Sequence, residues 1–192
     1  MEVKWEISAN KDFSNIVNSG SEKAKEENDY CVKIITDQLK PGTHYYYRFI
    51  HENSYSTTGR TKTLTKNTDR LKIGVINCAK YIGGYYQAFD ALSKMNDIDV
   101  VIHLGDYIYE NGSSVEGESY WSSVQATGRQ HDPLHECLSL DDYRTRYAQY
   151  HTDTVLQNLH ATFPMIVIWY DHEIAMKPLK KLKDGTMEYG GD

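Results

Sequence analysis

The sequence has few cysteines, no excess of positive charge and no long apolar run, and each shortage excludes a class of protein. Its three cysteines, Cys31, Cys78 and Cys137, lack regular spacing, so they form neither a disulfide framework nor the CxxC pair of a structural zinc site. The 21 basic and 27 acidic residues give a net charge of −6, which predicts no nucleic-acid-binding patch. No apolar run approaches the roughly 20 residues of a membrane span, and the first residues carry no signal-peptide pattern.

What remains is the composition of an ordinary globular protein. Hydrophobic residues make up 40% of the 192 residues and charged residues 25%, which allows one large domain or two small ones. Tyrosine is frequent, with 16 copies. Most of these side chains are expected to serve packing, except where a tyrosine stands beside other metal-ligand types.

Residues 1–68 are expected to form a β-rich domain. Short β-branched or aromatic runs predict strands at residues 3–7, 30–35, 45–50 and 56–64. Residues 20–29 are interpreted as a charged loop between the first two strands. The pattern L-x-P-G-T-x-Y-x-Y, which begins at Leu39, resembles the fibronectin type III domain. These strands are too few for a complete seven-stranded β-sandwich, so we expect a partial sandwich in which the chain begins mid-domain.

Residues 70–192 change to alternating strands and helices. Near-continuous apolar runs predict buried strands at residues 71–76, 99–104 and 165–169. Helical periodicity predicts helices at residues 85–94 and 154–162, and Ser139-Leu-Asp-Asp142 matches a capping box that opens a third helix. The resulting β-α-β-α-β order predicts a parallel sheet with right-handed crossovers.

Each predicted strand of this second part is followed by residues that bind metals. Cys78 follows the first strand, Asp106 and Tyr109 follow the second, and Asp171 and His172 follow the third. The carboxyl ends of parallel strands share one edge of a sheet, and ligands bind at that edge. We therefore expect these five side chains to converge.

Each residue also has a simpler interpretation. Cys78 alone is most often a small buried hydrophobe, Gly105-Asp106 is a common turn, and residues 171–173 suit a solvated segment. His103, inside the second strand, is interpreted as a core histidine whose polar atoms are satisfied. Three independent strand ends would all have to carry such residues by accident, so the shared-site hypothesis is favoured.

Longer motifs carry a family resemblance. HLGDYIYE, LDDYRTRYAQYHTD, LQNLHATFP and W-x-D-H-E occur in the order found in PhoD-type alkaline phosphatases and phosphodiesterases, members of the calcineurin-like metallophosphatase superfamily. The segments LKPGTHYYYRF and GRTKTL are similar to the N-terminal sandwich of that family. The resemblance extends to about Ala175. It implies a partial β-sandwich followed by the first half of a metallophosphatase α/β sandwich.

The resemblance implies a metal-dependent hydrolase of phosphate esters that uses a metal-activated hydroxide. Cys78, Asp106 and Tyr109 correspond to ligands of a ferric iron, and Asp106 would also bridge to calcium. Asp171 and His172 match a metal ligand and a group that contacts the phosphate or the leaving group. A trivalent ion lowers the pKa of a phenol or thiol, which suits these residue types.

The chain departs from the family pattern in places. Tyr170 replaces the first Asp of W-D-D-H-E, and Met176 and Lys177 stand where the family tends to have Asn. Because family catalytic domains continue for about as much sequence again, we expect a fragment that carries the N-terminal half of that domain. A catalytically incompetent PhoD-like chain remains an alternative. A purple-acid-type phosphatase is a weaker one, because that group expects Gly-Asn-His. Family members are often secreted or periplasmic, and the compartment of this chain stays open.

Overall fold

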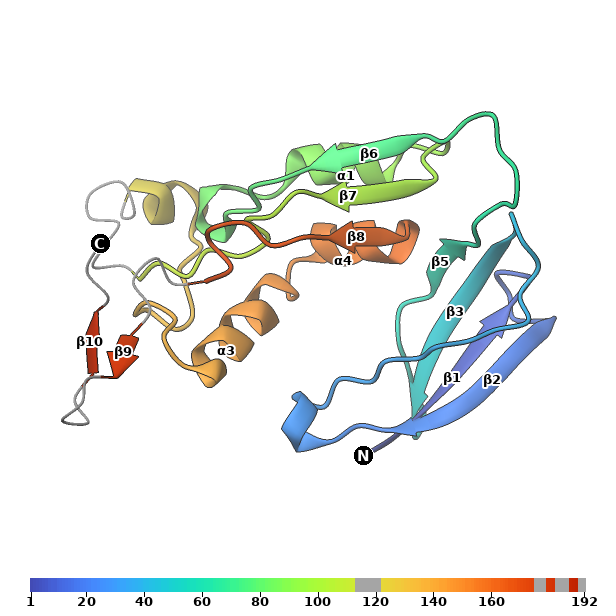
Figure 1. Cartoon of the computed structure of the whole chain (residues 1–192), viewed down its shortest axis with the longest axis horizontal. Helices are drawn as coiled ribbons and strands as arrows, with labels where there is room; N and C mark the ends of the chain where they lie inside the picture. The colour runs from blue at the N-terminus through green and yellow to red at the C-terminus, as the bar shows by residue number, and fades with distance from the viewer. Residues whose placement is uncertain (113–121, 175–178, 182–186, 190–192) are drawn as a thin grey trace. The chain divides into compact units, whose positions relative to one another are not determined.

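The computed structural model describes residues 1–112, 122–174, 179–181 and 187–189 (Figure 1). The chain divides into two compact units. The first contains residues 1–74, 95–101 and 158–165, and the second contains the described residues among 75–94, 102–157 and 166–192. The domain boundary expected near residue 69 stays a prediction. The substitutions noted at Met176 and Lys177 lie outside the described residues.

The N-terminal sheet is antiparallel and five-stranded. Its strands are β1 (Glu2–Ser8), β2 (Ile16–Lys23), β3 (His44–His51), β4 (Ser54–Tyr55) and β5 (Gly59–Lys62). The strand order is β2-β1-β3-β4, and β5 also pairs with β3. A short 3₁₀ turn, η1, covers Glu26–Asn28. Val3, Ile7 and Tyr45 are buried in this unit, as the β-branched and aromatic pattern predicts.

Two expectations for this sheet are wrong. Residues 30–35 form no strand. Within this segment Ile34 helps line a cavity of about 210 Å³, as do Thr36 and Leu39 just after it, while Ile35 is 87% exposed. Residues 20–23, expected in a loop, belong to β2, which pairs with β1 through backbone hydrogen bonds. Most β2 side chains are exposed, so the strand lacks the alternating apolar pattern that reveals strands in sequence.

The second sheet has three strands in the order β6 (Ile73–Ile76), β7 (Val100–His103) and β8 (Met165–Val167). The three arrows run the same way in Figure 1, so the expected parallel sheet is confirmed. The predicted helices are confirmed as α1 (Gln87–Ser93), α3 (Leu140–Tyr150) and α4 (Thr154–Thr162). A 3₁₀ turn, η2, covers Tyr81–Gly83, and β9 (Leu179–Lys181) pairs antiparallel with β10 (Met187–Tyr189).

No helix in the described part of the chain has the length and apolar character of a membrane span.

Helix α3 begins at the capping box expected from the sequence. The Ser139 hydroxyl accepts the amide of Asp142 at 3.2 Å, and the Asp142 carboxylate accepts the amide of Ser139 at 2.8 Å. These bonds favour the charged carboxylate and lower the pKa of Asp142 to about 2. The cap fixes where α3 starts, and so fixes the register of every residue that the helix presents.

Replacing Ser139 by alanine is expected to lower the free energy of unfolding by about 1 kcal/mol, because the first turn of α3 loses its side-chain acceptor. Urea unfolding followed by circular dichroism measures this change. Ser139→Thr keeps the hydroxyl and is the matched control. Equal stabilities of the alanine and threonine variants would contradict the assigned cap.

Candidate metal centre

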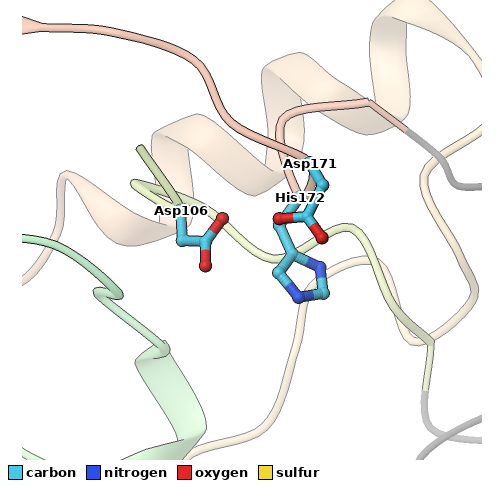
Figure 2. Close-up of side chains that lie close together, drawn as sticks. All are labelled: Asp106, Asp171 and His172. Carbon is cyan, nitrogen blue, oxygen red and sulfur yellow. The ribbon is translucent and has the colours of Figure 1, made fainter. Parts of the chain in front are cut away.

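The loops that follow β6, β7 and β8 bring the predicted ligands together. Oxygen or nitrogen atoms of Asp106, Asp171 and His172 all lie within 4.8 Å of one another. Figure 2 shows Asp171 and His172 side by side on one loop, facing Asp106 on another. Asp106 is buried, His172 is partly exposed and Asp171 is exposed, so the cluster is open to solvent on one side.

Cys78 and Tyr109 both contact the same carboxylate oxygen of Asp106. The Cys78 Sγ lies 3.4 Å from Asp106 Oδ2, and the Tyr109 hydroxyl lies 3.3 Å from it. The other oxygen, Oδ1, is buried and has no hydrogen-bond partner among the described residues. A buried carboxylate oxygen without a partner is costly unless a cation or a donor satisfies it.

The backbone at these strand ends is in the left-handed region. Cys78 has φ of 57° and Asp106 has φ of 53°, both uncommon values for residues with a side chain. Gly105, at φ 99°, is also close to Tyr170: an added Cβ would lie 2.3 Å from the Tyr170 Cβ. Hydrogen bonds from Cys78 N to Gly105 O and from Ala79 N to Asp106 O join the two loops. Backbone strain of this kind persists where the surroundings enforce it, most often at functional sites.

Glu173, which the sequence reasoning missed as a site residue, holds two of these loops in place. Its carboxylate is buried and accepts backbone N–H bonds from Asp106 at 3.2 Å, from Tyr170 at 2.8 Å and from Tyr107. The loop after β8 thereby fixes the backbone of the loop after β7. The only signal in the sequence was the third letter of D-H-E.

Glu110 was also missed, although it ends the HLGDYIYE motif. It is fully buried, and its Oε2 lies 2.8 Å from Nδ1 of His172. Burial raises the pKa of Glu110, while the hydrogen bond with His172 lowers it. When Glu110 is ionised it only accepts this hydrogen bond; Nδ1 of His172 then carries the proton, and Nε2 is the ring nitrogen that does not contact Glu110. The His172 ring also packs on the Tyr109 ring, with centroids 4.2 Å apart.

The thiol and the phenol of the cluster are held protonated. Burial raises the pKa of Tyr109, and the neighbouring Cys78 and Asp106 raise it further. Desolvation also raises the pKa of Cys78, and Asp106 and Asp171 add to that effect. A cation that binds both groups must therefore displace two protons, and its own charge provides the driving force.

His103 is a core histidine, but its polar atoms are not satisfied as expected. The side chain is fully buried, and neither ring nitrogen has a hydrogen-bond partner among the described residues. Its ring packs against the rings of Phe89 and Tyr107. Burial lowers its pKa, so the ring is held neutral and packs as an aromatic side chain.

The stability of the fold is expected to decrease in acid because of buried histidines. Burial and the nearby Arg146 lower the pKa of His131 from 6.5 to about 3, and burial also lowers the pKa of His151. A folded-state pKa below that of the unfolded chain means that the unfolded chain takes up the proton first as the pH falls. Above pH 6.5 His131 therefore costs the folded state no stability. Between pH 6.5 and 3 the free energy of unfolding falls as the pH falls, by at most about 1.4 kcal/mol per pH unit.

Urea unfolding at neutral and mildly acidic pH tests this prediction. His131→Gln keeps a donor for the Asn111 carbonyl, which His131 Nδ1 contacts at 2.8 Å, and should lose less stability on acidification than the wild type. His135→Gln changes a histidine whose side chain is 66% exposed and is the control. Parallel pH profiles for the wild type and His131→Gln would contradict the assignment.

Comparisons with known proteins agree with the resemblance in the sequence. The sequence model of the PhoD-like phosphatase family matches residues 73–181, and that of the PhoD-like phosphatase N-terminal domain matches residues 1–65. Alkaline phosphatase D of Bacillus subtilis (strain 168) is 38% identical over 187 residues, which cover 95% of this chain and 30% of that protein. A solved structure described as "Structure of PhoD" superimposes with a TM-score of 0.83 at 37% identity, covering 94% of this chain and 34% of that one. The chain thus spans about a third of the length of these relatives.

Proposed function

Because the chain belongs to the PhoD-like phosphatase family, we propose that it carries ligands of a metal centre that hydrolyses phosphate esters. One observation carries the proposal: the Cys78 thiol and the Tyr109 phenol meet at one oxygen of Asp106, beside Asp171 and His172. In this proposal Cys78, Asp106, Tyr109 and Asp171 are the metal ligands, and His172 and Asp171 take part in catalysis.

The donor atoms fit two kinds of cation. Thiolate, phenolate and carboxylate together suit ferric iron, whose charge favours the loss of both protons. The unpartnered Oδ1 of Asp106 and the exposed carboxylate of Asp171 suit calcium, a hard cation that prefers oxygen ligands. When bound, these ions supply Lewis-acid activation of water and of the phosphoryl oxygens.

Side chains around the cluster orient its residues and add positive charge, and both effects favour binding of a phosphate ester. Glu110 holds Nδ1 of His172, so that Nε2 is available to a phosphoryl oxygen or to the leaving group. Glu173 fixes the backbone of Asp106, which keeps the carboxylate in reach of Cys78 and Tyr109. The Lys80 ammonium lies 5.3 Å from the centroid of the Tyr109 ring and adds a positive charge near the cluster. That charge favours the approach of an anionic substrate.

A second candidate is a PhoD-like chain that binds metal without turnover. The match covers 30% of the Bacillus subtilis relative, so it does not by itself carry the activity of that whole protein over to this chain. The two candidates share the ligands and differ only in hydrolysis.

Purified protein tests both candidates by its iron and calcium content, its visible spectrum and its activity toward p-nitrophenyl phosphate and the bis ester at alkaline pH. The proposal expects both ions, a tyrosinate-to-iron absorption band and hydrolysis of an ester. Tyr109→Phe should abolish the band, whereas Tyr147→Phe, on α3, should keep it. Iron without hydrolysis would favour the second candidate. Protein that binds neither ion would overturn the metal centre for this chain.

A further inference from the structure

Arg146, on α3, is a fully buried cation, and its hydrogen bonds to the described residues all go to backbone carbonyl groups. The acceptors, with the donor–acceptor distances, are Asp132 O from Nε at 3.1 Å, Pro133 O from Nη2 at 2.7 Å, Asn111 O from Nη1 at 3.3 Å, His135 O from Nη2 at 3.4 Å, and Tyr109 O from Nη1. A guanidinium offers five N–H donors in a rigid fork, and this arrangement uses that geometry in full.

No carboxylate pairs with Arg146 within the part of the chain that the structure describes. Arg144, two residues earlier on the same helix, differs: it lies 3.5 Å from Asp141, whose side chain is 89% exposed. Burying a charge without a counter-charge is costly, and the carbonyl dipoles compensate only if their geometry is maintained. The bonds of Arg146 therefore order the backbone that supplies those carbonyls.

Two of the five carbonyls lie on either side of Glu110. They belong to Tyr109 and Asn111, so the guanidinium fixes the backbone before and after the carboxylate that contacts His172. Helix α3 also holds the other polar group of Tyr109: its N–H donates to the hydroxyl of Tyr150 at 3.1 Å. Arg146 and Tyr150 are four residues apart, so they project from the same face of the helix. The backbone of Tyr109 is thus fixed at both its N–H and its C=O by one helix face.

We propose that Arg146 is a positioning residue of the metal centre, which directs the Tyr109 phenol toward Asp106 and the Glu110 carboxylate toward His172. The first half rests on the proposed function, since it assumes that Tyr109 binds a cation. The second half does not, because the bond between Glu110 and His172 joins two side chains and involves no cation. The essential property is the fork of donors and not the charge alone, so lysine does not replace Arg146.

Arg146→Lys tests the proposal against Arg144→Lys, a matched change at a partly exposed position of the same helix. In metal-free protein, Arg146→Lys should shift the backbone nuclear magnetic resonance signals of residues 109–111 and the Nδ1 signal of His172, with unchanged helix content by circular dichroism. With iron, it should weaken iron binding at least about 10-fold and shift the tyrosinate-to-iron band. Arg144→Lys should change neither.

The outcomes separate this inference from the proposed function. A wild type that binds no iron overturns the metal centre, while the His172 signal still decides whether Arg146 positions Glu110. A wild type with the band and an Arg146→Lys variant with an unchanged band and unchanged His172 signal overturn the inference alone.

If Arg146→Lys does not fold, the wild type supplies the test. Gallium(III), a diamagnetic ion with the charge of ferric iron, should shift the guanidinium signals of Arg146 on binding and leave those of Arg144 unchanged. Guanidinium signals of Arg146 that do not shift when gallium binds would overturn the inference.

Discussion

Replacing Glu173 by alanine is expected to cost about 3 kcal/mol of unfolding free energy or more, the largest stability loss of any single change at the centre. The buried carboxylate accepts three backbone amides, of Asp106, Tyr107 and Tyr170. Alanine leaves all three donors without this acceptor, and the bonds from Asp106 and Tyr107 are buried. The loops after β7 and β8 would then separate, and metal binding should weaken together with stability.

Urea unfolding of the metal-free protein measures the loss. Glu27→Ala is the matched control, because the Glu27 side chain is 67% exposed and belongs to a surface ion pair. Glu173→Gln should fall between the wild type and Glu173→Ala, since its amide oxygen still accepts while its NH₂ group faces another donor. If the unfolding free energies of Glu173→Ala and Glu27→Ala agree within about 0.5 kcal/mol, Glu173 does not stabilise the loops after β7 and β8.

Asp106→Asn is expected to have opposite effects on metal binding and on the stability of the metal-free protein. It removes one of two carboxylates within 4.8 Å of each other and so relieves their repulsion. Asparagine also tolerates the left-handed backbone at this position, where φ is 53°. The metal-free variant should therefore be more stable by about 1 kcal/mol. In the proposed centre Asp106 would bind both ions, so the affinity for iron and for calcium should fall more than about 100-fold.

Thermal unfolding in the presence of a chelator, and metal content after dialysis, measure the two effects. Asp69→Asn, an exposed change in the segment between β5 and β6, should alter neither quantity. Tyr109→Phe should lose iron but keep calcium, whereas Asp106→Asn loses both. Retention of both ions by Asp106→Asn would refute the proposal that Asp106 binds both of them.

The sequence was a good guide wherever a pattern in the chain directly reflects burial. The β-branched run at residues 99–104 and the capping box at Ser139 predicted β7 and the start of α3. Strand β2 was missed because its side chains are mostly exposed, so backbone pairing alone defines it. Residues 30–35, in contrast, were predicted as a strand because they are apolar. They form irregular chain instead, and Ile34 helps line a cavity.

At the site, the residues at strand ends were found because a parallel sheet brings its carboxyl ends to one edge. Cys78, Asp106 and Tyr109 meet as that argument requires. Glu110 and Glu173 were missed because their roles depend on partners 62 and 67 residues away, His172 and the amide of Asp106. No local pattern shows which carboxylate will be buried against which donor, so these contacts required the structure.

The environment of Cys78 has a consequence for the redox chemistry of the chain. Cys78 is exposed, and an exposed thiol is normally open to oxidation and alkylation. Its raised pKa, caused by desolvation and by the carboxylates of Asp106 and Asp171, leaves little of the reactive thiolate at neutral pH. The acidic groups that would attract a cation thus also protect the thiol from electrophiles until that cation arrives.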